Sequence, residues 1–384
     1  GGPPVEWCAR RLLARMHAYS RRSRRQAVEP VTAQDLMRFL LRWQHVAPGT
    51  QVRGHHGVRA VVEQLQGHEA AVAAWEPEIL ARRVEGYRPP LLDRLCHDGE
   101  VTWLRLSVPP PLGDRRSGPS KATPVSLAFR DDLGWLLQAA RPDGDPGRPA
   151  LGATAEVVAA LERRGACFVS ELASATGRLV TDLEGALWDG VARGLLTADG
   201  FAAIRSLVAG AGTRPSSPAR SLSRRRRGAR AATTAAGRWS LVEAAEPVAD
   251  RESLAEVVAD QLLQRWGVVV RDLAVHDGLG VPWREVQWAL RRFEDRGLVR
   301  GGRFVAGFSG EQYALPAAVE GLGEVRRRPR SGERVVVNAC DPLNLTGVVV
   351  RDVPRVPAVR TRTVAYVDGQ PDLAPCQIGH GGTG

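Results

Sequence analysis

The clearest hydrophobic pattern in the chain lies in residues 283–293, where apolar side chains recur every three or four positions. This spacing places them on one face of an α-helix. The residues concerned are Trp283, Val286, Leu290 and Phe293. Pro282 suits the first position of such a helix, because its missing N–H costs nothing there, and Gly297 suits the left-handed residue that ends it. The pattern predicts an amphipathic helix with one face on a core.

Two short strand-like runs, at residues 298–300 and 303–305, follow this helix and flank a glycine pair. Two glycines between such runs are typical of a tight β-hairpin, so we predict a hairpin that turns at Gly301 and Gly302. Helices followed by a hairpin describe a winged helix, the helix-turn-helix variant that carries a β-hairpin wing.

The same pattern occurs three times along the chain. Residues 186–196 align without gaps with residues 289–299, and both contain an Arg-Gly-Leu junction. A fainter copy lies at residues 92–101. In all three copies a leucine precedes a glycine by seven positions, and an apolar stretch follows. Internal repeats of this kind predict a tandem array of one small unit.

The segment between the second and third copies has a different composition. Residues 206–242 contain no acidic side chain, and residues 224–227 are four consecutive arginines. Serine, proline, alanine and arginine dominate, which is typical of a disordered linker. Such a linker could act only as a tether, or its arginines could also contact nucleic acid, and both interpretations remain open.

The last part of the chain is rich in short β-branched runs, at residues 334–339, 346–350 and 363–367. Proline and glycine separate them, as in a small sheet or barrel. We therefore expect an α+β fold of tandem winged-helix modules followed by a small C-terminal β-barrel or β-sheet domain. The expected boundaries are a helical region with a winged-helix-like module at 1–107, a loop and strand connector at 108–150, winged-helix modules at 151–205 and 239–316, a disordered basic linker at 206–238, a β-rich, barrel-like domain at 317–372 and a flexible tail at 373–384.

Composition narrows the class of partner. The 384-residue chain carries a formal net charge of +11, which favours a polyanion such as nucleic acid. No run approaches the roughly 20 apolar residues that a membrane-spanning helix needs, so no membrane partner is expected. The five cysteines lie far apart and never in Cys-x-x-Cys spacing. This argues against a zinc site or a disulfide framework, and for a reducing, cytoplasmic compartment.

Several blocks of sequence resemble the C-terminal region of the large helicase-related (Lhr) family. The most specific are Ser-Gly-Glu-Gln at residues 309–312, within the similar stretch 301–316, and Asp-Pro-Leu-Asn at residues 341–344. Residues 355–358, 37–46 and 75–96 are similar too. The resemblance fails in the basic linker and in the glycine-rich tail.

Membership of that family would imply a superfamily 2 helicase that uses ATP to move 3′ to 5′ on single-stranded DNA in DNA repair. It would also imply tandem winged helices and a β-barrel, in a layout similar to that of a bacterial DNA glycosylase group. The expected partners are single-stranded DNA or an RNA:DNA hybrid, together with upstream motor domains of the same chain. Whether the protein forms a homo-oligomer is left open.

The chain carries no ATPase motif. A P-loop requires Gly-x-x-x-x-Gly-Lys-Ser/Thr, and the only lysine, Lys121, lies in Gly-Pro-Ser-Lys-Ala, which does not fit. There is no Asp-Glu dipeptide, and the histidines at 55, 56 and 68 have no recognised metal-ligand spacing. We therefore predict no catalytic, cofactor or metal site in this chain. ATP and Mg²⁺ are expected only on the missing motor domains.

Nucleic acid is expected to bind one helix and its wing. On the polar side of the helix at 283–293, arginines could meet phosphates, a glutamine could reach a base edge and a tryptophan could stack on an unpaired base. The predicted nucleic-acid-binding residues are Arg284, Gln287, Trp288 and Arg291 on the helix and Arg303 on the wing. Alternatively, Trp288 packs against a neighbouring module.

The equivalent helix of the second copy is expected to be architectural. Within residues 178–201 it carries Asp182, Glu184 and Asp189, whose charges would repel a phosphate backbone. The acidic side chains therefore favour an architectural role for this helix over nucleic-acid binding.

One enzymatic alternative is a DNA glycosylase-like module that excises bases. Such an enzyme flips a nucleotide and uses a carboxylate to activate water or to stabilise an oxocarbenium-like sugar. The β-rich domain offers Asp341, Asp352 and Asp368. Two of them also have a structural interpretation, since Asp-Pro at 341–342 is typical of the start of a turn and Asp-Gly at 368–369 is typical of a hairpin tip.

Overall fold

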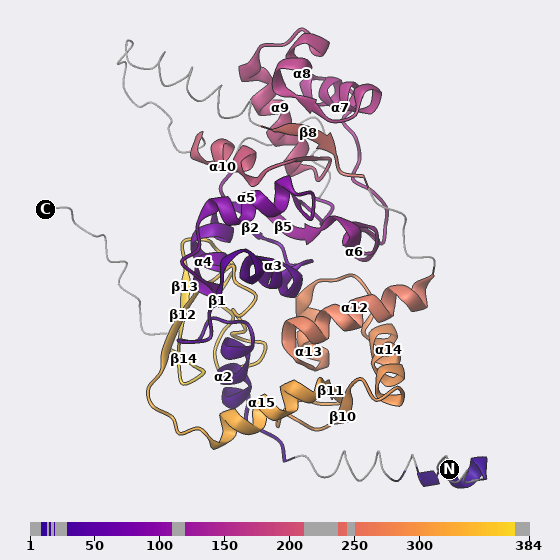
Figure 1. Cartoon of the computed structure of the whole chain (residues 1–384), viewed down its shortest axis with the longest axis vertical. Helices are drawn as coiled ribbons and strands as arrows, with labels where there is room; N and C mark the ends of the chain where they lie inside the picture. The colour runs from indigo at the N-terminus through magenta and orange to yellow at the C-terminus, as the bar shows by residue number, and fades with distance from the viewer. Residues whose placement is uncertain are drawn as a thin grey trace, which may run out of the picture.

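Three units of one topology, each with helices and a three-stranded antiparallel sheet, make up most of the computed structural model (Figure 1). The structure describes residues 9–13, 15, 16, 19, 29–109, 120–210, 237–243 and 250–372. We name the units module A (residues 54–129), module B (153–241) and module C (251–314). In each sheet the last strand in sequence lies between the other two. Helices followed by such a sheet form a winged helix, so the predicted tandem winged helices are confirmed.

Module C contains the helix that the hydrophobic pattern predicted. Its elements are α12 (Arg251–Trp266), β9 (Val268–Val269), α13 (Arg271–Asp277), α14 (Trp283–Asp295), β10 (Arg300–Gly302) and β11 (Gln312–Ala314). Pro282 immediately precedes α14, and Gly297 has a φ of +78° just after it, in the left-handed region that favours glycine.

The predicted position of the hairpin turn in module C is wrong. Gly301 and Gly302 lie within β10 and pair with Tyr313 and Gln312 of β11, so the turn is the longer loop of residues 303–311. The reason is tertiary. The Gln312 side chain accepts hydrogen bonds at 2.8 Å from the backbone N–H groups at positions 304 and 305, which holds the start of this loop against β11.

Module A has the same arrangement. Its elements are α3 (Gly54–Leu65), β2 (Ala70–Ala71), η1 (Val72–Ala74), η2 (Trp75–Leu80), α4 (Ala81–Arg83), β3 (Val84–Glu85), α5 (Pro89–His97), β4 (Val101–Leu104) and β5 (Pro124–Phe129). β3 pairs outside the module with β1 (Val52–Arg53). The strand expected in a connector between domains is β5, which is central in the sheet of module A. A short 3₁₀ turn, η3 (Arg130–Asp132), and α6 (Leu133–Ala140) follow it.

Module B differs from the sequence prediction at its end. Its elements are α7 (Ala153–Arg164), β6 (Cys167–Phe168), α8 (Val169–Thr176), α9 (Val180–Ala192), β7 (Leu196–Ala198), α10 (Phe201–Gly210) and β8 (Arg238–Leu241). Strand β8, expected to open the third winged helix at residue 239, instead pairs with both β6 and β7. The basic segment is therefore an insertion between two strands of one sheet. Most of it, residues 211–236, and the expected tail at 373–384 lie outside the described residues.

The C-terminal unit is a small sheet beside two helices. Its elements are α15 (Pro316–Arg327), β12 (Arg334–Asn338), β13 (Thr363–Val367) and β14 (Gln370–Asp372), and α2 (Ala33–Trp43) packs against α15. Within the described residues the sheet is open, with the order β12-β13-β14, so of the two expected forms, barrel or sheet, the structure shows a sheet and no closed barrel. The β-branched run at 346–350 forms a tight loop with one bridge between its ends instead of a strand. Val349 and Val350 are buried there, so packing rather than pairing uses their apolar surface.

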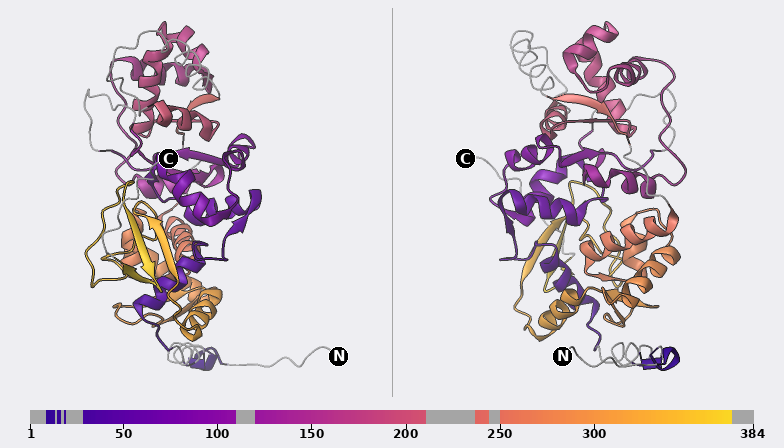
Figure 2. Two further views of the ribbon diagram at one scale, coloured as in Figure 1. Left: turned by 90° about the vertical axis from the view of Figure 1, so that its left-hand side faces the viewer. Right: turned by 45° about the vertical axis from the view of Figure 1, so that its right-hand side comes forward.

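Two hydrophobic cores hold these units together. One joins module C to α2, α6 and the C-terminal unit, and the other joins module A to module B. Both views in Figure 2 place module B at one end of the molecule, module A in the middle and module C with the C-terminal sheet at the other end. Among the described residues, no helix is long and apolar enough to cross a lipid bilayer.

Candidate nucleic-acid interface

The third helix of module C, α14, has one face in the core and one in solvent. Val286, Ala289, Leu290 and Phe293 are buried. Arg284, Trp288 and Arg291 are exposed, and Gln287 is half-buried. Because i, i+3 and i+4 side chains of a helix share a face, these four polar or aromatic residues lie together. The structure differs from the expected pattern at Trp283, which is half-buried rather than buried, and at Gln287, which is half-buried rather than exposed.

Arg284 and Trp288 form the most accessible part of this face. The guanidinium carbon of Arg284 lies 4.6 Å from the centroid of the Trp288 ring, a cation–π contact. Trp288 is 45% exposed, so no neighbouring module in the described part of the chain covers its ring. The same part of the chain gives Arg284 no carboxylate partner. An exposed aromatic ring beside an unpaired cation can take an unpaired base and its phosphate.

The wing contributes an acidic residue that sequence reasoning missed. Glu311, just before β11, accepts hydrogen bonds on Oε2 from Arg291 Nε at 3.0 Å, Arg291 Nη2 at 2.9 Å and Gln287 Nε2 at 3.2 Å. The Tyr313 hydroxyl donates to the same oxygen at 2.7 Å. The hydrogen bond to Glu311 raises the pKa of Arg291, which stays charged. The Ser-Gly-Glu-Gln block marked this position, but only the fold shows what Glu311 touches.

Arg303 lies on the wing, as predicted. It is exposed and follows directly after β10. In the described part of the chain it makes no hydrogen bond, ion pair or ring contact with the four residues on α14. The wing backbone around it is anchored, because Val31 N–H donates to the Phe304 carbonyl at 2.8 Å and Ala306 N–H donates to the Val31 carbonyl at 2.9 Å.

The equivalent helix of module B, α9, has a different character. Trp188 is fully buried, in contrast to Trp288. Asp189 is buried too, and its carboxylate accepts from Thr154 Oγ1 and Arg193 Nε, both at 2.8 Å. Before the helix, Arg178 is held by two hydrogen bonds of 2.6 and 2.7 Å to Glu156. These groups serve packing within module B.

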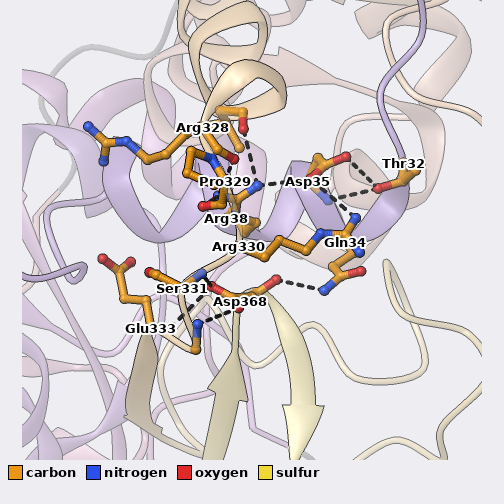
Figure 3. A network of polar contacts seen from close by, with 12 residues as sticks. Thr32, Gln34, Asp35, Arg38, Arg328, Pro329, Arg330, Ser331, Glu333 and Asp368 are labelled. Atoms are coloured by element: carbon orange, nitrogen blue, oxygen red, sulfur yellow. Dashed lines mark hydrogen bonds and ion pairs between the residues drawn. The ribbon is translucent and has the colours of Figure 1, made fainter.

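Asp368, a candidate catalytic carboxylate, lies in a network of polar contacts that Figure 3 shows from close by. It lies at the tip between β13 and β14 with a φ of +46°. Its carboxylate accepts from the backbone N–H groups of residues 331, 332 and 333 at 3.3, 2.7 and 3.2 Å. Lost hydration works against ionisation, but these donors and nearby Arg38 outweigh it and lower the pKa of Asp368. The carboxylate therefore caps a loop.

The same network fastens α2 to the end of α15. Arg38 donates to Asp35 at 3.2 Å and to the carbonyls of Val325, Arg328 and Pro329 at 3.0–3.1 Å (Figure 3). Asp352, another candidate carboxylate, is exposed and makes one long contact of 3.4 Å with Gln370. Asp368 lines a small cavity of about 20 Å³ together with Arg38, Arg42 and Glu333, a volume too small for a nucleotide.

Asp341, the third candidate, is buried against an arginine of module A. Arg83 Nη1 donates to its Oδ2 at 2.7 Å and Nη2 to its Oδ1 at 2.8 Å, and both side chains are 0% exposed. Asp341 Oδ1 also accepts from Leu343 N–H at 2.9 Å. Arg83 further donates to Gln44 Oε1 of the segment after α2, at 3.0 Å. This pair joins three parts of the fold.

Asp341 also lines a cavity of about 680 Å³ where module A, module C and the C-terminal unit meet. His68 is among its walls and contacts the Cys340 carbonyl at 3.1 Å. Burial, and then the charge of Arg265, lower the pKa of His68 to about 4, so this ring is neutral at pH 7. Lys121, Arg355 and Arg360 also line the cavity, which gives it a basic side.

Comparison with known proteins assigns the winged helices to a family. The winged-helix domains of the large helicase-related protein match residues 31–129, which comprise α2 and module A, and residues 248–334, which comprise module C and α15. They correspond to the third and fourth winged-helix domains of that family. Both matches include secondary structure that lies outside the repeated unit itself.

Two curated relatives match almost the whole chain. The "Lhr helicase/uracil glycosylase" of Escherichia coli is 28% identical over 379 residues, which cover 89% of this chain and 23% of that protein. The "Lhr helicase/ probable uracil glycosylase" of Mycolicibacterium smegmatis is 30% identical over 370 residues, 90% of this chain and 23% of that protein. The chain therefore spans about a quarter of the length of these relatives.

Among solved structures, the Streptomyces sahachiroi DNA glycosylase AlkZ is similar with a TM-score of 0.47 and 13% sequence identity. The similarity covers 89% of this chain and 87% of that one. The family assignment depends instead on the two winged-helix matches and the two relatives. The chain belongs to the large helicase-related (Lhr) family and corresponds to its C-terminal region.

Proposed function

We propose that this region binds single-stranded nucleic acid for a large ATP-dependent 3′-to-5′ DNA helicase that acts in DNA repair, with the ATPase motor elsewhere in the parent protein. The observation that carries the proposal is the exposed Arg284–Trp288 pair on α14. In three-helix variants of the helix-turn-helix the third helix is the recognition helix. Here its solvent face carries a ring available for stacking.

The chemistry of the face favours an unpaired strand over a duplex. A tryptophan that projects from a helix can stack on a splayed base, whereas bases inside a duplex are already stacked. Arg284 has no carboxylate to satisfy it and can meet the phosphate beside that base. An RNA:DNA hybrid remains a candidate partner where it opens into a single strand.

The test is a titration of single-stranded DNA against Trp288→Ala and Arg284→Ala. Loss of one stacked base costs about 1–3 kcal/mol, so Trp288→Ala should weaken binding at least fivefold. Arg284→Ala should weaken binding and also flatten its dependence on salt, because one phosphate contact is lost. Fluorescence anisotropy at several salt concentrations measures both.

Arg178→Ala is the matched control, since Arg178 is partly exposed but is held by Glu156. It should leave affinity within twofold of the unchanged protein. If Arg178→Ala weakens binding as much as Trp288→Ala while all variants remain folded, the assignment of binding to α14 is wrong. An affinity unchanged by both α14 variants would also contradict it.

Base excision is a second candidate, because a carboxylate lines the 680 Å³ cavity and both relatives carry "uracil glycosylase" in their names. A glycosylase must take a flipped nucleotide into a pocket. Of the three carboxylates considered, only Asp341 lines this cavity. Because Arg83 holds both of its oxygens, it suits electrostatic stabilisation of a cationic sugar better than proton abstraction.

This candidate predicts that the chain releases free uracil from a uracil-containing single strand. Asp341→Asn should then reduce release at least tenfold, because the negative charge is lost while the side-chain shape is kept. Asp352→Asn, at the exposed carboxylate outside the cavity, is the control and should leave release unchanged. Chromatography of the released base measures the rate. Absence of release by the unchanged protein, or equal rates in both variants, would contradict a role for Asp341.

A further inference from the structure

Glu311 holds two of the residues that form the face of α14. Its Oε2 accepts from Gln287 Nε2 at 3.2 Å and from Arg291 Nε and Nη2 at 3.0 and 2.9 Å. The Arg291 side chain is 50% exposed and that of Glu311 is 34% exposed, so the cluster lies at the surface. An ionised carboxylate can only accept hydrogen bonds. Each partner must therefore turn an N–H group towards it.

This arrangement fixes the side-chain amide of Gln287. Its NH₂ group is directed to Glu311, so its carbonyl oxygen is on the opposite side of the amide. Within the described residues Gln287 Oε1 makes no hydrogen bond. A free glutamine offers both a donor and an acceptor and can rotate to suit either. A glutamine held in this way offers only an acceptor, at the position directly before Trp288 in α14.

An acceptor at this position distinguishes between bases. Adenine, cytosine and guanine carry exocyclic amino groups that can donate to it, whereas unsubstituted purine presents only ring-nitrogen acceptors at the corresponding edge. The amino-bearing bases would complete the hydrogen bond of Gln287. A base with no N–H group on that edge, such as unsubstituted purine, would leave that oxygen unpaired when the strand covers it.

Glu311 also changes what Arg291 can do. The arginine keeps its charge but has Nε and Nη2 occupied and a counter-charge in contact. A phosphate would have to compete with that carboxylate. Arg284 has no carboxylate partner in the described part of the chain, so phosphate attraction on α14 is concentrated there.

We propose that Glu311 is a specificity-determining residue of the nucleic-acid-binding face: it orients Gln287 to accept from an amino-bearing base and withholds Arg291 from the phosphates. The inference depends on the proposed binding of single-stranded nucleic acid by α14. It implies that Glu311 lowers total affinity and increases discrimination between bases. If Glu311 had only a structural role, its replacement would not raise total affinity and reduce base discrimination at the same time.

The test compares two 12-nucleotide strands, one of deoxyadenosine and one of purine deoxyriboside, which lacks only the amino group. The unchanged protein should bind the adenine strand about fivefold more tightly, the effect of one neutral hydrogen bond. Glu311→Gln should reduce this ratio to about one, because a glutamine can donate as well as accept and no longer fixes Gln287. It should bind both strands more tightly, with a log-log salt slope steeper by about 0.7 as Arg291 gains a phosphate.

Two further variants separate the parts of the proposal. Gln287→Leu removes the acceptor and should abolish discrimination without steepening the salt slope. Glu285→Gln is the matched control, because Glu285 is also an acid of α14 but pairs with Arg251 at 2.7 Å, away from Glu311. It should keep the adenine preference of the unchanged protein. Circular-dichroism melting checks that each variant is folded.

The outcomes are distinguishable from failure of the proposed function. If the unchanged protein binds neither strand, both the proposed function and this inference are contradicted. If it binds both strands equally and Trp288→Ala still weakens binding, the proposed binding of nucleic acid by α14 is supported and the proposed role of Glu311 is contradicted. Retention of both the adenine preference and the salt slope in Glu311→Gln would overturn it too.

Discussion

Replacement of Trp239 by alanine is expected to lower the free energy of unfolding of module B by about 3–5 kcal/mol, the usual cost of deleting a large buried aromatic side chain. Trp239 is 0% exposed and lies in β8, the central strand of its sheet. Its ring meets that of Trp103 of module A edge-on, with centroids 6.1 Å apart. The indole Nε1 has no hydrogen-bond partner among the described residues, so the loss is one of packing.

Hydrogen exchange read by mass spectrometry locates the effect. Protection should fall first in β6, β7 and α9 of module B, and next in module A, which shares its core. Module C should keep its protection. Trp288→Ala is the control, since a 45% exposed ring contributes little to folding and should cost less than about 1 kcal/mol. Loss of protection in module C before module B would show that β8 belongs to the third winged helix.

Replacement of Arg83 by methionine is expected to cost about 3–5 kcal/mol of folding free energy, because it leaves the carboxylate of Asp341 buried and unpaired. The pair is bidentate, and both side chains are 0% exposed. Arg83 also holds Gln44, so module A, the C-terminal unit and the segment after α2 should loosen together. Denaturant unfolding measures the change.

The double variant Arg83→Met/Asp341→Asn tests the cause of that loss. With no charge left in the site, it should recover at least half of the destabilisation, and asparagine keeps the acceptor for Leu343 N–H. Arg53→Met is the control, because the Arg53–Glu85 pair is 77% and 58% exposed and surface pairs contribute about 0–1 kcal/mol. A double variant no more stable than Arg83→Met would show that lost packing, not an uncompensated charge, dominates.

The sequence alone determined the features that depend on neighbouring residues. The three- and four-residue spacing of apolar side chains predicted α14, and Pro282 and Gly297 predicted its ends. The repeated junction predicted a tandem array, which the structure and the family matches confirm. The exposure of Arg284 and Arg291 followed from the same periodicity, whereas packing of Trp288 against a neighbouring module was an open alternative that only the structure decided. A helix is expected to expose the face opposite its apolar stripe, which holds for α14, whereas in α9 Trp188 and Asp189 are buried as well.

Only the tertiary structure decided the features that depend on distant residues. Strand β8 is separated from β7 by the basic insertion, and no local pattern tells which sheet a short strand will join. Asp341 and Arg83 are 258 positions apart, and Glu311 lies 20 positions from Arg291. The valines at 348–350 have the composition of a strand but lie in a loop. The β-propensity of a residue reflects how well its side chain fits a half-buried surface. In this protein a packed loop provides such a surface for these valines.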